Sequence, residues 1–322
     1  IEHMLGSSDP YRSIYAKIGA ANRAEAVAWY SIQFGDSNES KAAERLSEHL
    51  LEMFWDYAGR IYALRIAGQP RLAASMADFL IAQTAQAANE ATATATREAY
   101  LRVCARALSE QGSLYLETSA RKQVLTHTRP VALHLRAIAQ ELKDADLLGL
   151  SHAIWAGAYN IDKRFQMGRP LYAQAFAEVQ PADLQLRALR GLAIAATFLQ
   201  DKDEVMAVAQ KTQAMVDAGQ CTNLEQVCET LEGVGRAQGI MGSKKAVQWF
   251  ESAERMLPTL NYPPLRRVQI IESKLEVLYR TEPAAVIEFE RIGQDGLRLA
   301  EQHGYARHQA LLVGMLEKTL NA

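Results

Sequence analysis

The sequence predicts an all-α protein, and three observations support that class. Ala is the most abundant residue, and Leu, Glu, Gln and Arg, which also favour helices, are frequent. No segment shows the strict apolar–polar alternation of a strand. The nine prolines and most of the glycines fall between segments of helical periodicity. With 322 residues, 49% of them hydrophobic, the chain can form two domains or one extended array of repeats.

The first segment, residues 1–35, predicts two short helices separated by a tight turn. Asp9 and Pro10 are suited to the N-cap and the first helical position, and Gly19 ends the first helix. Asn22 then caps the second helix, with Glu25 placed as its capping-box partner. The polar stretch GDSNES at 35–40 separates this pair from the rest of the chain.

The stretch IYAKIGAANRAEAVAWY, within residues 11–30, resembles the C-terminal half of a LuxR-type (NarL/FixJ, GerE-like) helix-turn-helix domain. The matching residues are Ile14, Tyr15, Lys17, Ile18, Gly19, Asn22, Arg23, Glu25, Ala26 and Val27. The resemblance implies that the natural protein binds DNA, with Arg12, Lys17 and Arg23 near phosphates.

This chain departs from the family pattern in two ways. The stretch LGSSDPYR (5–12) lengthens the connection, and the first two helices of the domain are absent. We therefore expect DNA binding through the complete N-terminal domain and not by this chain alone. An alternative is that HM (3–4) with the small residues after it is a cloning remnant, and that the helix pair only packs.

The region 36–180 is predicted to be helical, with repeats that cannot be assigned. The expected helices cover 40–67, 70–88, 94–118, 121–143 and 144–161. The Thr-rich stretch 88–98 is expected to be a loop or a frayed helix start, and QMGRP at 166–170 is expected to be a second break. The helix at 40–67 has a large aromatic stripe, which either packs within the monomer or forms the seam of a homodimer; the stripe consists of Phe54, Trp55, Tyr57 and Tyr62.

The region 181–322 predicts paired helices with a period of roughly 40 residues, which is typical of an antiparallel helical-hairpin solenoid. The expected helices are 182–199, 202–217, 222–237, 243–257, 264–280, 284–303 and 305–320. The spacing of Ala246, Phe250, Ala253 and Pro258 resembles the second half of a tetratricopeptide (TPR) repeat. That resemblance implies that Phe250 is buried between helices, and the glycines at 233 and 235 indicate a close helix crossing.

The sequence contains no motif for catalysis, a cofactor or a metal. It lacks a P-loop, GxGxxG, GxSxG and HExxH, so we expect no enzymatic activity, no cofactor and no metal site. The three cysteines form no CxxC pair and are expected to be reduced and mostly buried. No signal peptide or long apolar run is found, and the formal net charge is -2, so the expected location is the cytoplasm.

Two sets of residues are candidates for binding a ligand or partner. His152, Trp155 and Tyr159 share one helix face, which in a solenoid lines the concave side or belongs to the core. Arg187 and Arg190 interrupt an apolar helix, where they either grip a carboxylate or peptide backbone or form a solvated face.

Two functions from different classes are compatible with these features. The first is a bacterial transcription regulator with a LuxR-type DNA-binding head. A TPR-like body would then sense a peptide, a small molecule or a protein, or mediate oligomerisation. The second is a TPR-like protein–protein interaction scaffold with no role on DNA.

Overall fold

A computed structural model describes residues 39–261, 263–282 and 286–320. All regular secondary structure in these residues is helical, in thirteen α-helices and one 3-10 turn, which confirms the all-α class. The segment that resembles a helix-turn-helix, with Arg12, Lys17 and Arg23, lies outside the described residues.

The helices follow one another through short connections. Their bounds are α3 Glu39–Ile66, α4 Pro70–Glu90, α5 Thr94–Thr118, α6 Val124–Leu142, α7 Ala145–Ile161, α8 Phe165–Glu178, α9 Ala182–Phe198, α10 Lys202–Asp217, α11 Leu224–Ile240, α12 Ala246–Met256, α13 Pro263–Thr281, α14 Val286–Gln302 and α15 Ala306–Leu320. The 3-10 turn, Leu257–Thr259, lies between α12 and α13.

Most of the predicted helices agree with these bounds, and of the two predicted interruptions one is present but shorter and the other is wrong. In the Thr-rich stretch 88–98 the chain leaves the helical conformation only at 91–93, since α4 continues to Glu90 and α5 begins at Thr94. QMGRP lies inside α8, where Pro170 falls near the start of the helix and removes a single hydrogen bond of its early turns. Gly168 is there for packing, because a Cβ at this position would lie 3.1 Å from the carbonyl oxygen of Ala156 on α7.

The helices form two layers. Consecutive helices pack side by side, and each odd-numbered helix from α3 to α15 also contacts the next odd-numbered one. The even-numbered helices pack mainly on their neighbours in sequence and stand behind this row. The odd-numbered helices therefore make up an inner layer, and the even-numbered ones an outer layer.

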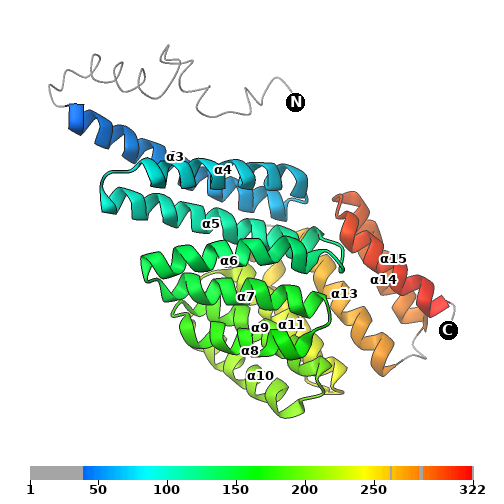
Figure 1. The fold of residues 1–322 in the computed structure, drawn as a ribbon. Coiled ribbons are helices and arrows are strands. Elements are labelled where there is room, and N and C mark those ends of the chain that lie inside the picture. The colour runs from blue at the N-terminus through cyan, green and yellow to red at the C-terminus, as the bar shows by residue number, and fades with distance from the viewer. Residues whose placement is uncertain (1–38, 262, 283–285, 321–322) are drawn as a thin grey trace.

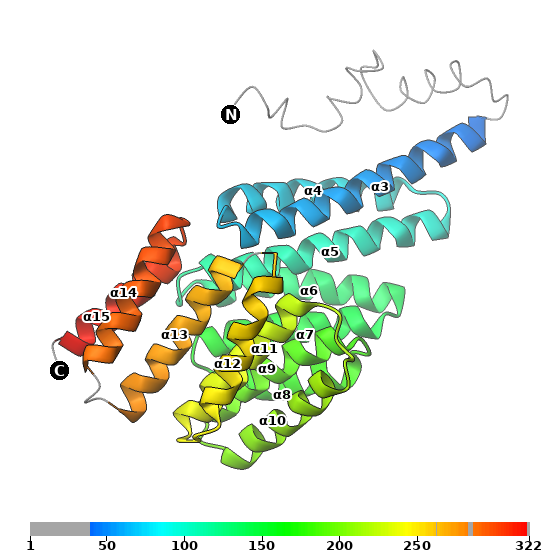
Figure 2. The ribbon, with the colours of Figure 1, turned by 180° about the vertical axis from the view of Figure 1, so that it is seen from behind.

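The row of helices curves until its end meets its beginning, as Figures 1 and 2 show. Ile66 at the end of α3 lies in one buried cluster with Val268 of α13 and Tyr305, just before α15. Arg307 of α15 donates a hydrogen bond of 2.8 Å to the carbonyl oxygen of Leu116 in α5. The inner helices consequently surround a central space.

Close helix packing occurs where the sequence predicts it. A Cβ at Gly233 of α11 would lie 2.6 Å from Cγ of Arg190 on α9, and one at Gly235 would lie 2.9 Å from Cβ of Trp249 on α12. Phe250 is only 4% exposed, which confirms its predicted burial. Its ring lies against the Gly235 backbone of α11, and Lys274 of α13 covers it at 6.0 Å.

The cysteines and the aromatic stripe of α3 also have defined places. All three cysteines are free; Cys104 and Cys228 are buried and Cys221 is partly buried, in agreement with the prediction. Most of the stripe is used within the chain. Phe54 is buried against Tyr100, Tyr57 contacts Phe79 and Tyr62 faces the central space, whereas Trp55 is 45% exposed.

Candidate binding cavity

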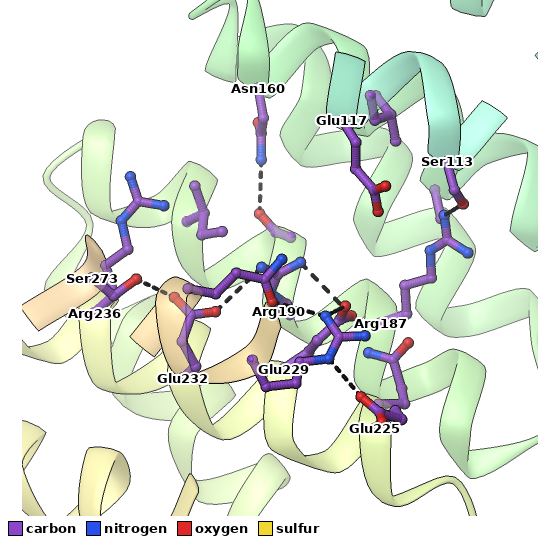
Figure 3. A pocket seen from close by; sticks show the side chains of 18 of the residues that line it. Ser113, Glu117, Asn160, Arg187, Arg190, Glu225, Glu229, Glu232, Arg236 and Ser273 are labelled. Carbon is purple, nitrogen blue, oxygen red and sulfur yellow. Dashed lines mark hydrogen bonds and ion pairs between the residues drawn. The ribbon is translucent and has the colours of Figure 1, made fainter. Parts of the chain in front are cut away.

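Seven helices surround one large cavity. It has a volume of about 970 Å³, and its walls come mainly from the inner layer: α3, α5, α7, α9, α11, α13 and α15. Figure 3 shows how side chains from several of these helices converge on it. The volume is in the range of clefts that bind small molecules. Because charged and polar side chains line this cavity, it is the candidate binding site of the described residues.

One wall of the cavity is a row of carboxylates on α11. Glu225, Glu229 and Glu232 recur at steps of four and three residues, which places them on one helix face. Arg266 of α13 donates through Nε to Glu225 at 2.7 Å and also pairs with Glu229. Arg190 of α9 pairs with Glu232 at 3.2 Å. This row of charges links three inner helices.

Another part of the wall is formed around Arg65 of α3. Its Nε lies 3.1 Å from a carboxylate oxygen of Glu110 on α5, and its guanidinium also pairs with Glu117. The Arg65 and Glu110 side chains are only 10% and 5% exposed. Because removing one partner of a buried ion pair leaves an uncompensated charge, these contacts fix α3 against α5.

Glu229 lies at the electrostatic centre of the cavity. Burial alone would raise the pKa of its carboxyl group, but four guanidinium groups outweigh that effect and lower the pKa to about 2. In order of their effect, they belong to Arg266, Arg190, Arg65 and Arg187. The carboxylate is therefore ionised at neutral pH and neutralises part of a dense positive field.

The cavity wall carries a small excess of positive charge. Within the described residues, nine lysine and arginine side chains line it, against eight carboxylates. The basic set is Arg65, Arg106, Lys163, Arg187, Arg190, Arg236, Arg266, Arg280 and Arg307; the acidic set is Glu110, Glu117, Asp183, Glu225, Glu229, Glu232, Glu272 and Glu276. A wall so nearly balanced is unsuited to a polyanion.

Arg187 differs from the neighbouring arginines in its partners. Its Nη2 donates to Oγ of Ser113 at 3.2 Å, and no carboxylate of the described residues lies within ion-pair distance. Burial lowers the pKa of Arg187, whereas at Arg190 the effect of burial is outweighed by Glu232 and Glu229, which raise the pKa. Arg187 is thus a partly buried cation to which the residues described by the structure supply no counter-ion.

The other predicted binding residues lie on a different face. His152, Trp155 and Tyr159 do not line the cavity; the face of α7 that does so carries Ala153 and Gly157. His152 Nδ1 lies 2.8 Å from Glu178 of α8, in the outer layer. Trp155 and Tyr159 stack on each other with ring centroids 6.3 Å apart. Of the five candidate binding residues, only Arg187 and Arg190 come together at the cavity.

Sequence reasoning missed most of the charged cavity wall. The signal in α11 was present, because three glutamates share one face of a helix whose other residues are mainly apolar or small. Arg65 and Arg266 carried no comparable signal, since arginines are common in amphipathic helices and Arg266 is followed directly by another arginine, Arg267. Their partners lie about forty residues or more away in the sequence.

The described residues show neither a candidate metal site nor a candidate membrane span. No group of three or more His, Cys, Asp or Glu side chains in them is arranged to hold a metal ion. Among the helices seen in this part of the chain, none has the length and apolar character needed to cross a membrane.

No model of a known protein family matches the chain, and a search of curated protein sequences also finds no match.

Proposed function

We propose that this chain is the sensing part of a cytoplasmic bacterial transcription regulator. A LuxR-type DNA-binding head would be coupled to a TPR-like helical body, and the body would bind a ligand in its central cavity. The observation that carries the proposal is the cavity, because six helices from different parts of the sequence, α3, α5, α9, α11, α13 and α15, contribute charged side chains to one space. Such a space lets a ligand bias the packing of the whole array.

The body is proposed to be TPR-like because of its layers. In a helical-hairpin solenoid, one helix of each pair faces the concave side, and neighbouring repeats stack through these helices. The contacts between successive odd-numbered helices follow that scheme. The spacing of Ala246, Phe250, Ala253 and Pro258 adds support from the sequence.

The DNA-binding half of the proposal rests on the resemblance of residues 11–30. The test is a fluorescence anisotropy titration of duplex DNA at two salt concentrations. It compares the 322-residue chain with a longer chain that includes the reading frame upstream of Ile1. We expect weak or no binding by the shorter chain, and binding by the longer chain that falls steeply with salt as counter-ions are released.

A substitution at Lys17 refines this test. In the longer chain, Lys17→Ala should weaken binding about equally on all DNA sequences, because a phosphate contact positions the protein without specifying bases. Lys122→Ala, at an exposed site between α5 and α6, is the matched control and should change nothing. The absence of salt-dependent binding by the longer chain would refute the regulator proposal.

The alternative function is a TPR-like scaffold that binds proteins and not DNA. One observation favours it, an exposed apolar site at the start of α14, where Ile287 is 86% and Val286 is 37% exposed. The same titration decides between the two functions. If the longer chain does not bind DNA, Ile287→Asp should be tested for loss of self-association by light scattering.

A further inference from the structure

The inference starts from a charge without a partner. Arg187 projects from α9 into the cavity, where its only protein acceptor among the described residues is Oγ of Ser113, at 3.2 Å. Ser113 Oγ in turn lies 3.0 Å from the carbonyl oxygen of Ser109, to which it donates, so its lone pairs face Arg187. A guanidinium has five N–H donors, and within the described ranges of the chain only one of these donors has an acceptor.

The other cavity cations already have acceptors or face solvent. Arg236 and Arg280 both pair with Glu276, and Arg106 pairs with Glu110. Arg307 is hydrogen-bonded to backbone carbonyl oxygens of α5, and Lys163 is exposed. The buried Nε groups of Arg190 and Arg236 also lack a hydrogen-bond partner, but both side chains are neutralised by glutamates. Among the described residues, Arg187 is therefore the buried cavity arginine that has neither a carboxylate nor a backbone carbonyl as its partner.

The charge balance limits that anion to a single negative charge. The wall has one more cation than carboxylates, and Glu229 and Glu110 act electrostatically on Arg187 without touching it. A dianion such as a phosphate ester would meet repulsion from these carboxylates with only one free guanidinium to offset it. A carboxylate matches the planar fork of one arginine and carries one charge.

The surface beside Arg187 is apolar. Gly191, Ile194 and Phe198 follow Arg187 on the face of α9 that lines the cavity. At a rise of 1.5 Å per residue, Ile194 is about 10 Å and Phe198 about 17 Å along the helix from Arg187. Phe198 stacks on Phe165 with ring centroids 4.5 Å apart, and the guanidinium of Arg280 lies 5.3 Å from the centroid of the Phe198 ring, so the ring borders this end of the cavity beside a cation.

We propose that Arg187, held by Ser113, is the carboxylate-binding subsite of the cavity, and that the ligand is an elongated monocarboxylate. Its apolar part lies along Ile194 and Phe198. This inference rests on the proposed ligand-sensing function and names the class of ligand. The carboxylate can belong to an aliphatic acid or to the C-terminus of a short peptide, and the probes below separate these sources.

The binding experiment uses the 322-residue chain and isothermal titration calorimetry, without DNA. The probes are octanoate and octanamide, N-acetyl-trialanine with a free or an amidated C-terminus, and inorganic phosphate, each up to about 10 mM, which is tenfold above a millimolar Kd. We expect one of the two carboxylates to bind at least about tenfold more tightly than its amide, in keeping with a hydrogen bond to a charged group. The carboxylate that binds identifies the source.

Variants of Arg187 test whether this residue is responsible. Arg187→Gln should weaken carboxylate binding about tenfold or more and leave amide binding unchanged, and Arg187→Lys should retain part of the affinity. Arg136→Gln, on the exposed face of α6, is the control and should bind like the unaltered chain. Equal binding of acid and amide, an equal effect of Arg187→Gln on both, or no carboxylate binding at all would overturn the proposal. Tighter binding of phosphate that depends on Arg187 would overturn it as well.

The stability of the unliganded chain gives an independent readout. A buried arginine without a counter-ion lowers the stability of the unliganded protein. The Arg187→Gln variant should therefore have a Tm equal to or above that of the unaltered chain. Arg266→Gln, which breaks pairs with Glu225 and Glu229, should melt lower. A fall in Tm for Arg187→Gln like that of Arg266→Gln would make Arg187 structural and end the proposal. Because no arm involves DNA, a failure of DNA binding leaves these results unaffected.

Discussion

Single residues in this protein have roles that their burial and partners define. Phe250 fills the space between α11 and α13, while Val247, three residues earlier on α12, is 59% exposed. Glu229 is surrounded by guanidinium groups from three other helices. The first contributes through packing and the second through charge, and each contribution can be measured separately.

Phe250→Ala should destabilise the chain by about 3–5 kcal/mol, because it removes a buried ring and leaves a cavity. The measurement is the free energy of unfolding from urea denaturation. Val247→Ala on the same helix should change it by less than about 0.5 kcal/mol. A loss below about 1 kcal/mol for Phe250→Ala would show that the ring does not fill the space between the helices.

Glu229 should make stability depend on pH in the acid range. Its pKa in the folded protein, about 2, is below the ordinary value, so its contribution is present above about pH 5 and is lost as the pH falls towards 2. The shift corresponds to a contribution on the order of 3 kcal/mol at neutral pH. At pH 7 the free energy of unfolding of Glu229→Gln should be lower than that of the unaltered chain by this amount. Between pH 5 and pH 2 the stability of the variant should fall less steeply.

The control for this prediction is Glu251→Gln, an exposed carboxylate on α12. It should leave both the stability at pH 7 and the acid profile unchanged. Unfolding by urea at several pH values measures all three proteins. Parallel acid profiles for Glu229→Gln and the unaltered chain would show that Glu229 does not carry the pH dependence.

At the scale of elements, several helices are followed by a residue in the left-handed conformation, and this residue is not always glycine. Lys143 follows α6 with φ 52°, and its N–H bonds the carbonyl oxygens of Ala139 and Gln140. Asp144, the next residue, caps α7 by accepting from the N–H of Leu147 at 3.1 Å. Burial acts to raise the pKa of Asp144, but this bond and Arg102 outweigh it and lower the pKa. Two helices are thus joined by adjacent caps.

Lys143→Gly should stabilise the chain by about 0.5–1 kcal/mol, because glycine adopts the left-handed conformation without steric cost. Lys143→Ala removes the same exposed side chain but keeps the unfavourable φ, so it should give no gain. Thermal unfolding followed by circular dichroism at 222 nm compares the two variants. An equal rise in Tm for both would assign the effect to the lysine side chain and not to the backbone.

At the scale of the whole molecule, the closing contact between the two ends of the array decides whether there is a cavity. Gly68, after α3, has φ 77°, and a Cβ there would lie 2.9 Å from the ring of Tyr305 and 3.2 Å from the carbonyl oxygen of His303. The turn that ends the first described helix is thus packed against the loop before the last one. Without this contact the inner helices would line an open groove.

Gly68→Ala should therefore lower the stability of the chain by more than the strain of placing alanine in a left-handed backbone conformation. Gly219→Ala is the matched control, since Gly219 has φ 62° and no atom within 4 Å of an added Cβ. We expect the free energy of unfolding to fall by about 1 kcal/mol in the control. In Gly68→Ala it should fall by about 2–4 kcal/mol, because the added Cβ also clashes with its neighbours. Hydrogen exchange should show faster exchange of α15 in Gly68→Ala only. Equal losses and unchanged exchange would mean that the ends do not hold each other.

The sequence by itself determined the class and most of the helix bounds. Helix formers, caps and apolar periodicity act within a few residues, so α5 at Thr94–Thr118 and α10 at Lys202–Asp217 were predicted to the residue. The error at 166–170 has a structural origin. Gly168 resembles a helix breaker in sequence, and only the proximity of α7 shows that it is a packing site.

The tertiary structure alone decided where the charged residues meet. Arg187 and Arg190 were recognised as unusual because they interrupt an apolar helix, a local signal. Their partners were not predicted, because Ser113 and Glu232 are brought to them by the curvature of the whole array. Periodicity also could not distinguish the His152 face of α7 from the Ala153 face, since both carry residues suited to burial. Which face lines the cavity follows from which neighbours pack on α7, and those neighbours are fixed by long-range contacts.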